Sequence, residues 1–119
     1  MVDEKVLEEL QASVGGDRGF VRDLIDAYVA DSAGQLEAIE AALAAGDAEA
    51  LVRPAHTLKS SSATVGAMDL SSLARTLEMA GRSGTLGDAE TRAAAGGLRD
   101  ASDAAVRALR TWVAGVDGR

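Results

Sequence analysis

Apolar residues recur along most of this chain at intervals of three, four and seven positions, which is the period of an amphipathic α-helix. The longest such stretch lies between Asp17 and Gly46, and its apolar face comprises Val21, Leu24, Tyr28, Leu36, Ile39 and Leu43. Similar stretches cover about 48–63, 69–81 and 88–115. Because β-branched residues are sparse and no stretch alternates apolar and polar residues as a strand would, the pattern predicts an all-α protein.

Helix start and stop signals divide these stretches. A short helix over about 3–13 ends at "GGD", and "AAGD" ends the long helix, with Gly46 as its C-terminal residue and Asp47 as the next N-cap. Gly96–Gly97 should weaken or bend the last helix, at about 1 kcal/mol per glycine. Four long helices with short connections predict an antiparallel four-helix bundle with a short additional N-terminal helix, as a single domain over residues 1–119.

Composition and charge exclude several classes of protein. The chain is 47% hydrophobic but only 3% aromatic, so alanine and leucine must fill its core. It has no cysteine and a single histidine, which leaves neither a disulfide framework nor the usual ligands of a zinc site. No apolar run reaches the roughly 18 residues of a membrane span, and the N-terminus is unlike a signal peptide. A net charge of -7 offers no basic stripe for nucleic acid. We therefore expect a cytoplasmic protein that binds neither nucleic acid nor membrane.

One window, "RPAHTLKSSSATVGA" over 53–67, contrasts with the acidic chain around it. It holds the only histidine, the only proline, one of the two lysines, three consecutive serines and no acid. On a helical wheel, a core stripe follows Leu51, Ala55, Leu58, Ser62 and Val65. His56 points away from this stripe, and the residues around it, at offsets of three, four and seven, are Val52, Lys59, Ser60 and Ala63. The wheel therefore predicts an accessible imidazole ringed by small side chains and one ammonium group, even if Pro54 bends the helix.

This combination of side chains suits phosphoryl transfer. Neutral imidazole is a nitrogen nucleophile at physiological pH, and the transferred group mainly needs its oxygens stabilised. Lys59, one helical turn from His56, is a flexible charge that reaches such oxygens, and Ser60 or its neighbours add donors. Each residue alone is unspecific, since a lone histidine or lysine on a helix is usually an ordinary surface or core residue. Their joint spacing is what favours the chemistry.

The segment "AHTLKSSSATVGA" resembles the signature of the histidine phosphotransfer (HPt) domain family. The resemblance extends to the preceding segment, "GGDRGFVRDLIDAYVADSAGQLEAIEAALAAGDAEAL", and to the following one, "MDLSSLARTLEMAGRSG", and so covers nearly the whole chain. It implies that His56 accepts a phosphoryl group on Nε2, that Lys59 stabilises this group, and that Gly66 permits close helix packing behind the site.

Glu78 occupies the position at which members of this family often place Gln or Glu to hydrogen-bond the histidine Nδ1. Such a bond would fix the tautomer and leave Nε2 free, although Glu78 is also compatible with an ordinary exposed helix carboxylate. Ser60 stands where many members have glycine, so its hydroxymethyl group either crowds a partner or adds a donor to the phosphate. The residues expected at the partner surface are Val52, Ser60, Ala63 and Gly66.

The resemblance implies a phosphorelay intermediate, in which a receiver-domain aspartate phosphorylates His56 and the group then passes to another receiver. The chain has no Gly-rich nucleotide-binding loop, so we expect a phosphocarrier without its own ATP site and not an enzyme. No cofactor is expected, and the metal for the transfer should belong to the receiver. The expected partners are response-regulator receiver domains and a hybrid sensor kinase, and the protein is expected to be a monomer.

The alternative is a non-catalytic helical adaptor that binds a signalling partner through one face. It accounts equally well for the composition and the periodicity, but it gives no reason for histidine, lysine and serine to share a non-core face. A serine hydrolase built on "SSS" lacks a credible triad, since the single histidine would serve a serine on its own helix with no oxyanion hole. We therefore favour the phosphotransfer interpretation.

Overall fold

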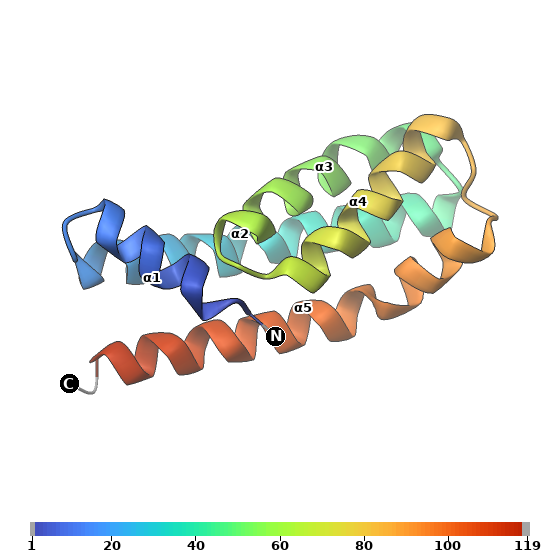
Figure 1. The fold of residues 1–119 in the computed structure, drawn as a ribbon. Helices are drawn as coiled ribbons and strands as arrows, with labels where there is room; N and C mark the ends of the chain where they lie inside the picture. Colours follow the sequence, from blue (N-terminus) through green and yellow to red (C-terminus); the bar gives the residue numbers. More distant parts are fainter. Residues whose placement is uncertain (1, 118–119) are drawn as a thin grey trace.

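The computed structural model describes residues 2–117, with side chains through residue 115, and this part of the chain contains five α-helices and no strand (Figure 1). The helices are α1 (Glu4–Ser13), α2 (Arg18–Ala45), α3 (Ala48–Thr64), α4 (Met68–Ser83) and α5 (Ala89–Asp117). Each helix from α2 to α5 runs antiparallel to the helix that precedes it in the chain (Figure 1). Helix α1 lies at the end of the bundle where α3 leads into α4. The predicted all-α bundle with a short additional N-terminal helix is confirmed. Within the described range, no helix combines the length and the hydropathy of a membrane span.

Local signals account for most of the helix ends. The carboxylates of Asp17 and Asp47 cap α2 and α3 by accepting hydrogen bonds from backbone N–H groups at 3.0 and 3.1 Å. Gly46 follows α2 in the left-handed conformation, with a φ of 65°, which glycine adopts without strain. These boundaries match those predicted from "GGD" and "AAGD". Helix α5 continues through Gly96–Gly97, so the expected weak point does not interrupt it.

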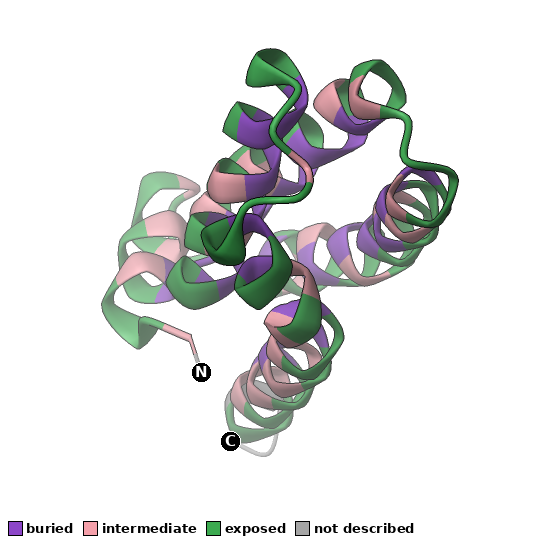
Figure 2. Cartoon of the chain, turned by 90° about the vertical axis from the view of Figure 1, so that its right-hand side faces the viewer, coloured by how far each residue is buried: buried purple, intermediate pink, exposed green. Residues whose placement is uncertain are grey.

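The core is built from leucine, isoleucine, valine and alanine on the sides of the helices that face one another (Figure 2). In α2 the buried residues are Val21, Ile25, Tyr28, Ser32, Leu36, Ile39 and Ala42. The predicted face included Leu24 and Leu43, which are only half-buried. The observed face has an unbroken spacing of three and four, and the residues in it that were not predicted are Ile25, Ser32 and Ala42. This correction shifts the buried face of α2 and leaves the bundle unchanged.

The short helix α1 packs on the turn between α3 and α4. The N–H of Asp3 donates to the carbonyl oxygen of Gly66 at 2.8 Å, and Leu7 is fully buried. Gly66 has a φ of 80°, and a Cβ atom there would lie 2.7 Å from the Asp3 carbonyl oxygen and 3.2 Å from Val6 Cβ. Glycine is therefore required at this turn both by its conformation and by the close approach of α1.

Candidate functional site

Helix α3 turns His56 toward solvent because its opposite side is anchored in the core. The residues of α3 that the helical wheel placed in the core, all of them buried, are Leu51, Ala55, Leu58 and Ser62. The His56 side chain is 54% exposed. The helix continues through Pro54, so the proline does not end it. The imidazole therefore stands on the accessible face of a helix whose other face is packed in the bundle.

Glu78, on the neighbouring helix α4, contacts both His56 and Lys59. Its Oε2 lies 2.9 Å from His56 Nδ1, and its Oε1 lies 2.7 Å from Lys59 Nζ. The Glu78 side chain is only 6% exposed, so the interpretation as an exposed helix carboxylate is wrong. The structure thus brings together the three residues to which the family resemblance assigned the chemistry.

Arg82 is a fourth member of this cluster, and it was not predicted from the sequence. Its Nε and Nη2 donate to Glu78 Oε2 at 3.1 and 2.8 Å. One carboxylate oxygen therefore contacts both Arg82 and His56. Glu78 and Arg82 are four residues apart in "LEMAGR", a spacing at which side chains meet on a helix surface. That spacing could have predicted the contact between Arg82 and Glu78, but it does not reveal that α3, which carries His56, lies alongside α4.

The surrounding donors keep the buried carboxyl group of Glu78 ionised. Burial by itself raises the pKa of Glu78, but the close ion pair with Lys59 and the hydrogen bonds from Arg82 and His56 outweigh burial and lower the pKa from 4.5 to about 2. In order of effect, the donors are Lys59, Arg82 and His56. Because an ionised carboxylate only accepts hydrogen bonds, His56 Nδ1 carries a proton and donates it to this bond. In the neutral ring the lone pair then lies on Nε2.

Close packing between α3 and α4 supports these contacts. A Cβ atom on Gly81 of α4 would lie 3.0 Å from Val52 Cγ2 of α3. A second contact comes from Ser71, whose Oγ donates to the carbonyl oxygen of Lys59 at 2.8 Å. These two contacts lie on either side of His56 along α3 and on either side of Glu78 along α4, so the helices are held together above and below the His56–Glu78 contact.

The residues expected at the partner surface are Val52, Ser60, Ala63 and Gly66. Ser60 is exposed, and Val52 and Ala63 are half-buried on the same side of α3 as His56. Gly66 is buried against the start of α1, so the structure corrects its assignment to the partner surface. The close helix packing that was expected of Gly66 is present, because α1 approaches it closely. Beside His56, a second close approach, which was not predicted, joins α3 and α4 at Gly81.

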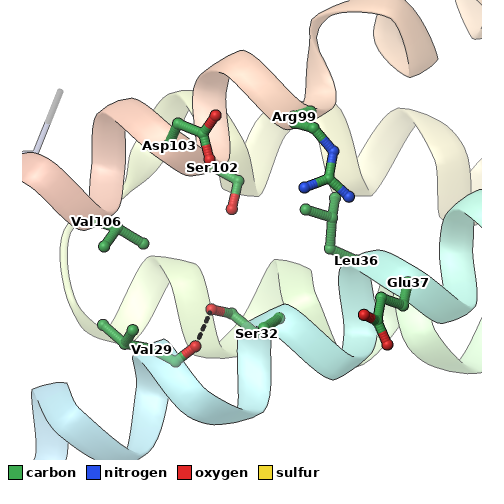
Figure 3. Close-up of a pocket in the computed structure, with 9 residues that line it drawn as sticks. Val29, Ser32, Leu36, Glu37, Arg99, Ser102, Asp103 and Val106 are labelled. Carbon is green, nitrogen blue, oxygen red and sulfur yellow. Dashed lines mark hydrogen bonds between the residues drawn. The ribbon is translucent and has the colours of Figure 1, made fainter.

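A separate hollow lies between α2 and α5 (Figure 3). It is lined from α2 by Val29, Ser32, Ala33, Leu36 and Glu37, and from α5 by Arg99, Ser102, Asp103 and Val106. None of these residues was predicted for the site, and the residues that were predicted lie on α3, on α4 or in the turn between them. The hollow therefore does not belong to the candidate site.

Comparison with known proteins agrees with this geometry. The Hpt domain family model matches residues 23–116, which is most of the chain, and the protein belongs to this family. Among solved structures, the chain is similar to histidine-containing phosphotransfer protein B (HptB) from Pseudomonas aeruginosa PAO1. The sequence identity is 29% and the TM-score 0.81, with 94% of this chain and 93% of that chain covered. Comparison with curated protein sequences found no match. The chain is thus a histidine phosphotransfer protein, a phosphocarrier that acts with receiver domains in a phosphorelay.

Proposed function

We propose that His56 Nε2 is the atom that accepts the phosphoryl group. The observation that carries this assignment is that His56, the only histidine of the chain, is exposed while a buried carboxylate holds its Nδ1. A histidine phosphotransfer protein with one histidine has one residue available for the covalent intermediate. The orientation of the ring leaves the Nε2 lone pair for the incoming phosphorus.

The transfer needs no proton movement within the site. The Nε2 lone pair attacks the phosphorus of an aspartyl phosphate on a receiver domain. A nitrogen–phosphorus bond forms, the bond between phosphorus and the aspartyl oxygen breaks, and its electron pair returns to the receiver carboxylate. The ring gains a positive charge and keeps the proton on Nδ1, where Glu78 accepts the hydrogen bond and compensates the charge. The reverse sequence of bond changes delivers the group to a second receiver.

Lys59 and the small residues around His56 complete the proposed site. Lys59 lies one turn from His56, and its side chain, which is 30% exposed, is flexible enough to bring the ammonium group to the phosphoryl oxygens. Val52, Ser60 and Ala63 form a surface with small side chains on which a receiver can bring its phosphoaspartate up to the imidazole. A modest interface is sufficient for such a transient encounter.

We further propose a monomeric, cytoplasmic carrier that has no ATP site and no cofactor of its own. The donor and acceptor are response-regulator receiver domains, and a hybrid sensor kinase is one source of the donor. Any metal ion used in the transfer is bound by the receiver. In support, the sequence has no Gly-rich nucleotide-binding loop, and its net charge of -7 disfavours nucleic acid as a partner.

A receiver domain labelled on its aspartate tests the assignment of His56. We expect label on the native chain and none on His56→Gln, with circular dichroism showing that both are folded. The bond should be acid-labile and base-stable, as a phosphoramidate is. Label on His56→Gln would contradict the assignment. Failure of a whole panel of receivers to label the native protein would favour the helical adaptor instead.

A further inference from the structure

Two cations share the Glu78 carboxylate, although one would suffice to neutralise it. Lys59 Nζ lies 2.7 Å from Oε1, and Arg82 binds Oε2 through Nε and Nη2 at 3.1 and 2.8 Å. The proposed function gives Lys59 a second anion to bind, the phosphoryl group on His56. Lys59 therefore has two competing anionic partners.

Before the ring of His56 gains its positive charge, Lys59 is able to leave Glu78 only if the carboxylate keeps another cation. The Glu78 side chain is 6% exposed, and a buried charge that loses its only partner is strongly destabilised. Arg82 is suited to remain, because its guanidinium is always charged and offers several donors in a fixed plane. It also lies on α4, four residues after Glu78, so its contact does not depend on the position of α3.

We propose that Arg82 is a positioning residue, which holds Glu78 on His56 Nδ1 while Lys59 turns from Glu78 to the phosphoryl group. This inference rests on the proposed function. The charges are consistent with it. Two cations and one carboxylate leave one net positive charge beside the neutral ring, and the transferred phosphoryl group brings a charge of about -2 while the ring gains one positive charge. Without the charge of Arg82 the excess positive charge beside the ring disappears, and Lys59 stays with Glu78.

The variant Arg82→Gln removes the charge and keeps an amide donor. We expect single-turnover transfer from a phosphorylated receiver to slow about tenfold, as for the loss of one charge-assisted hydrogen bond in the transition state. Arg82→Lys should recover most of the rate because it restores the charge. The matched control is Arg99→Gln, expected to transfer at the native rate. Arg99 of α5 donates to Glu40 of α2 through Nε and Nη2, as Arg82 does to Glu78.

The substitution Lys59→Gln distinguishes a positioning role of Arg82 from direct contact with the phosphoryl group and from a purely structural role. Because Arg82 acts through Lys59, Lys59→Gln should move the phosphorus NMR signal of the phosphohistidine in the native background and not in Arg82→Gln. For the same reason, the rate losses of the two single variants should not multiply in the double variant. His56 is the only histidine, so its nitrogen NMR signals report one ring, and Nδ1 should keep its proton in each single variant.

Transfer by Arg82→Gln at the native rate would overturn this inference, and so would losses that multiply independently for Arg82 and Lys59. In Arg82→Gln, Lys59 should stay with Glu78, so Glu78 should still accept the hydrogen bond from His56 Nδ1. Loss of the Nδ1 proton in this variant would therefore also overturn the inference. A native protein that accepts nothing from any receiver would instead overturn the proposed function, which the comparison with His56→Gln tests separately.

Discussion

Gly81 of α4 lies so close to Val52 of α3 that a Cβ atom at position 81 would be 3.0 Å from Val52 Cγ2. The same atom would be 2.9 Å from the carbonyl oxygen of Ala48. Gly81 comes three residues after Glu78, and Val52 lies one turn before His56. The missing side chain at position 81 therefore sets the helix separation across which the carboxylate reaches the imidazole.

The substitution Gly81→Ala should destabilise the protein and slow phosphotransfer. Alanine in a helix interior is ordinarily about 1 kcal/mol better than glycine, but inserting an atom into a full interface costs roughly 1–3 kcal/mol. Because one of the close neighbours is a backbone carbonyl, the helices themselves must move apart. We expect the free energy of unfolding in urea to fall by about 1 kcal/mol. Single-turnover transfer should slow in the same variant, since Glu78 is displaced from His56.

The substitution Gly96→Ala is the matched control. Gly96 also lies inside a helix, α5, and a Cβ atom there would have no neighbour within 4 Å. Only the helix propensity changes, so this variant should gain about 1 kcal/mol and transfer at the native rate. Equal stabilisation by Gly81→Ala and Gly96→Ala would show that α3 and α4 are not in tight contact at Gly81.

The Glu78 cluster should make the folded state sensitive to acid. The pKa of Glu78 falls from 4.5 to about 2 on folding, so its ionised form stabilises the fold above about pH 4.5 and this stability is lost as the pH falls toward 2. The contribution is on the order of 3 kcal/mol. Urea unfolding of the native protein and Glu78→Gln at several pH values measures it. The gap in the free energy of unfolding between them should be widest near neutral pH and close across this window.

The substitution Glu40→Gln provides the comparison for that experiment. Glu40 also pairs with an arginine, Arg99, which lowers its pKa, but its side chain is 41% exposed. Exposed pairs of this kind contribute about 0–1 kcal/mol. The gap between the native protein and Glu40→Gln should therefore change little with pH. Native and Glu78→Gln stabilities that fall in parallel down to pH 2 would contradict the role given to the buried carboxylate.

The helix boundaries were predictable from the sequence because their determinants are local. Asp17 and Asp47 cap helices with their own side chains, and Gly46 ends one with its own backbone conformation. The buried face of α2 was less predictable. Ser32 is 3% exposed in the structure, and a serine becomes a core residue only because of the helices that pack around it. The hydropathy of a residue contains no information about which helices pack around it.

The site was predictable along α3 and not between helices. Spacing alone placed His56 on the exposed face, because one helix determines that arrangement. The contact of His56 with Glu78 joins residues 22 positions apart, and its expectation came from the family resemblance and not from periodicity. Close packing was expected of Gly66 and is present there, but the close approach of α3 and α4 at Gly81 was not predicted, because the sequence does not show which helix approaches a glycine. Arg82 was missed for the same reason.

The contact between Tyr28 of α2 and Ser62 of α3 should stabilise the bundle without taking part in transfer. The hydroxyl oxygens lie 2.8 Å apart in the core. Tyr28→Phe leaves the fully buried Ser62 hydroxyl without this partner, at a cost of about 1–3 kcal/mol in the free energy of unfolding. The double variant Tyr28→Phe/Ser62→Ala should lose less than the sum of the single losses. Transfer should stay at the native rate, since Ser62 lies on the core side of α3; slower transfer by folded Tyr28→Phe would contradict this.

The same contact should be visible in alkaline titration, because Tyr28 is the only tyrosine of the chain. Burial raises the pKa of Tyr28 above its ordinary value of 10, and the hydrogen bonds with Ser62 and Ser32 offset this only in part. A raised pKa means that the neutral phenol stabilises the fold fully below pH 10, and that this contribution is lost as the pH rises through the higher folded value. Phenolate absorbance should therefore appear at higher pH in the folded protein than in urea. Coincident curves would show that the Tyr28 hydroxyl is open to solvent.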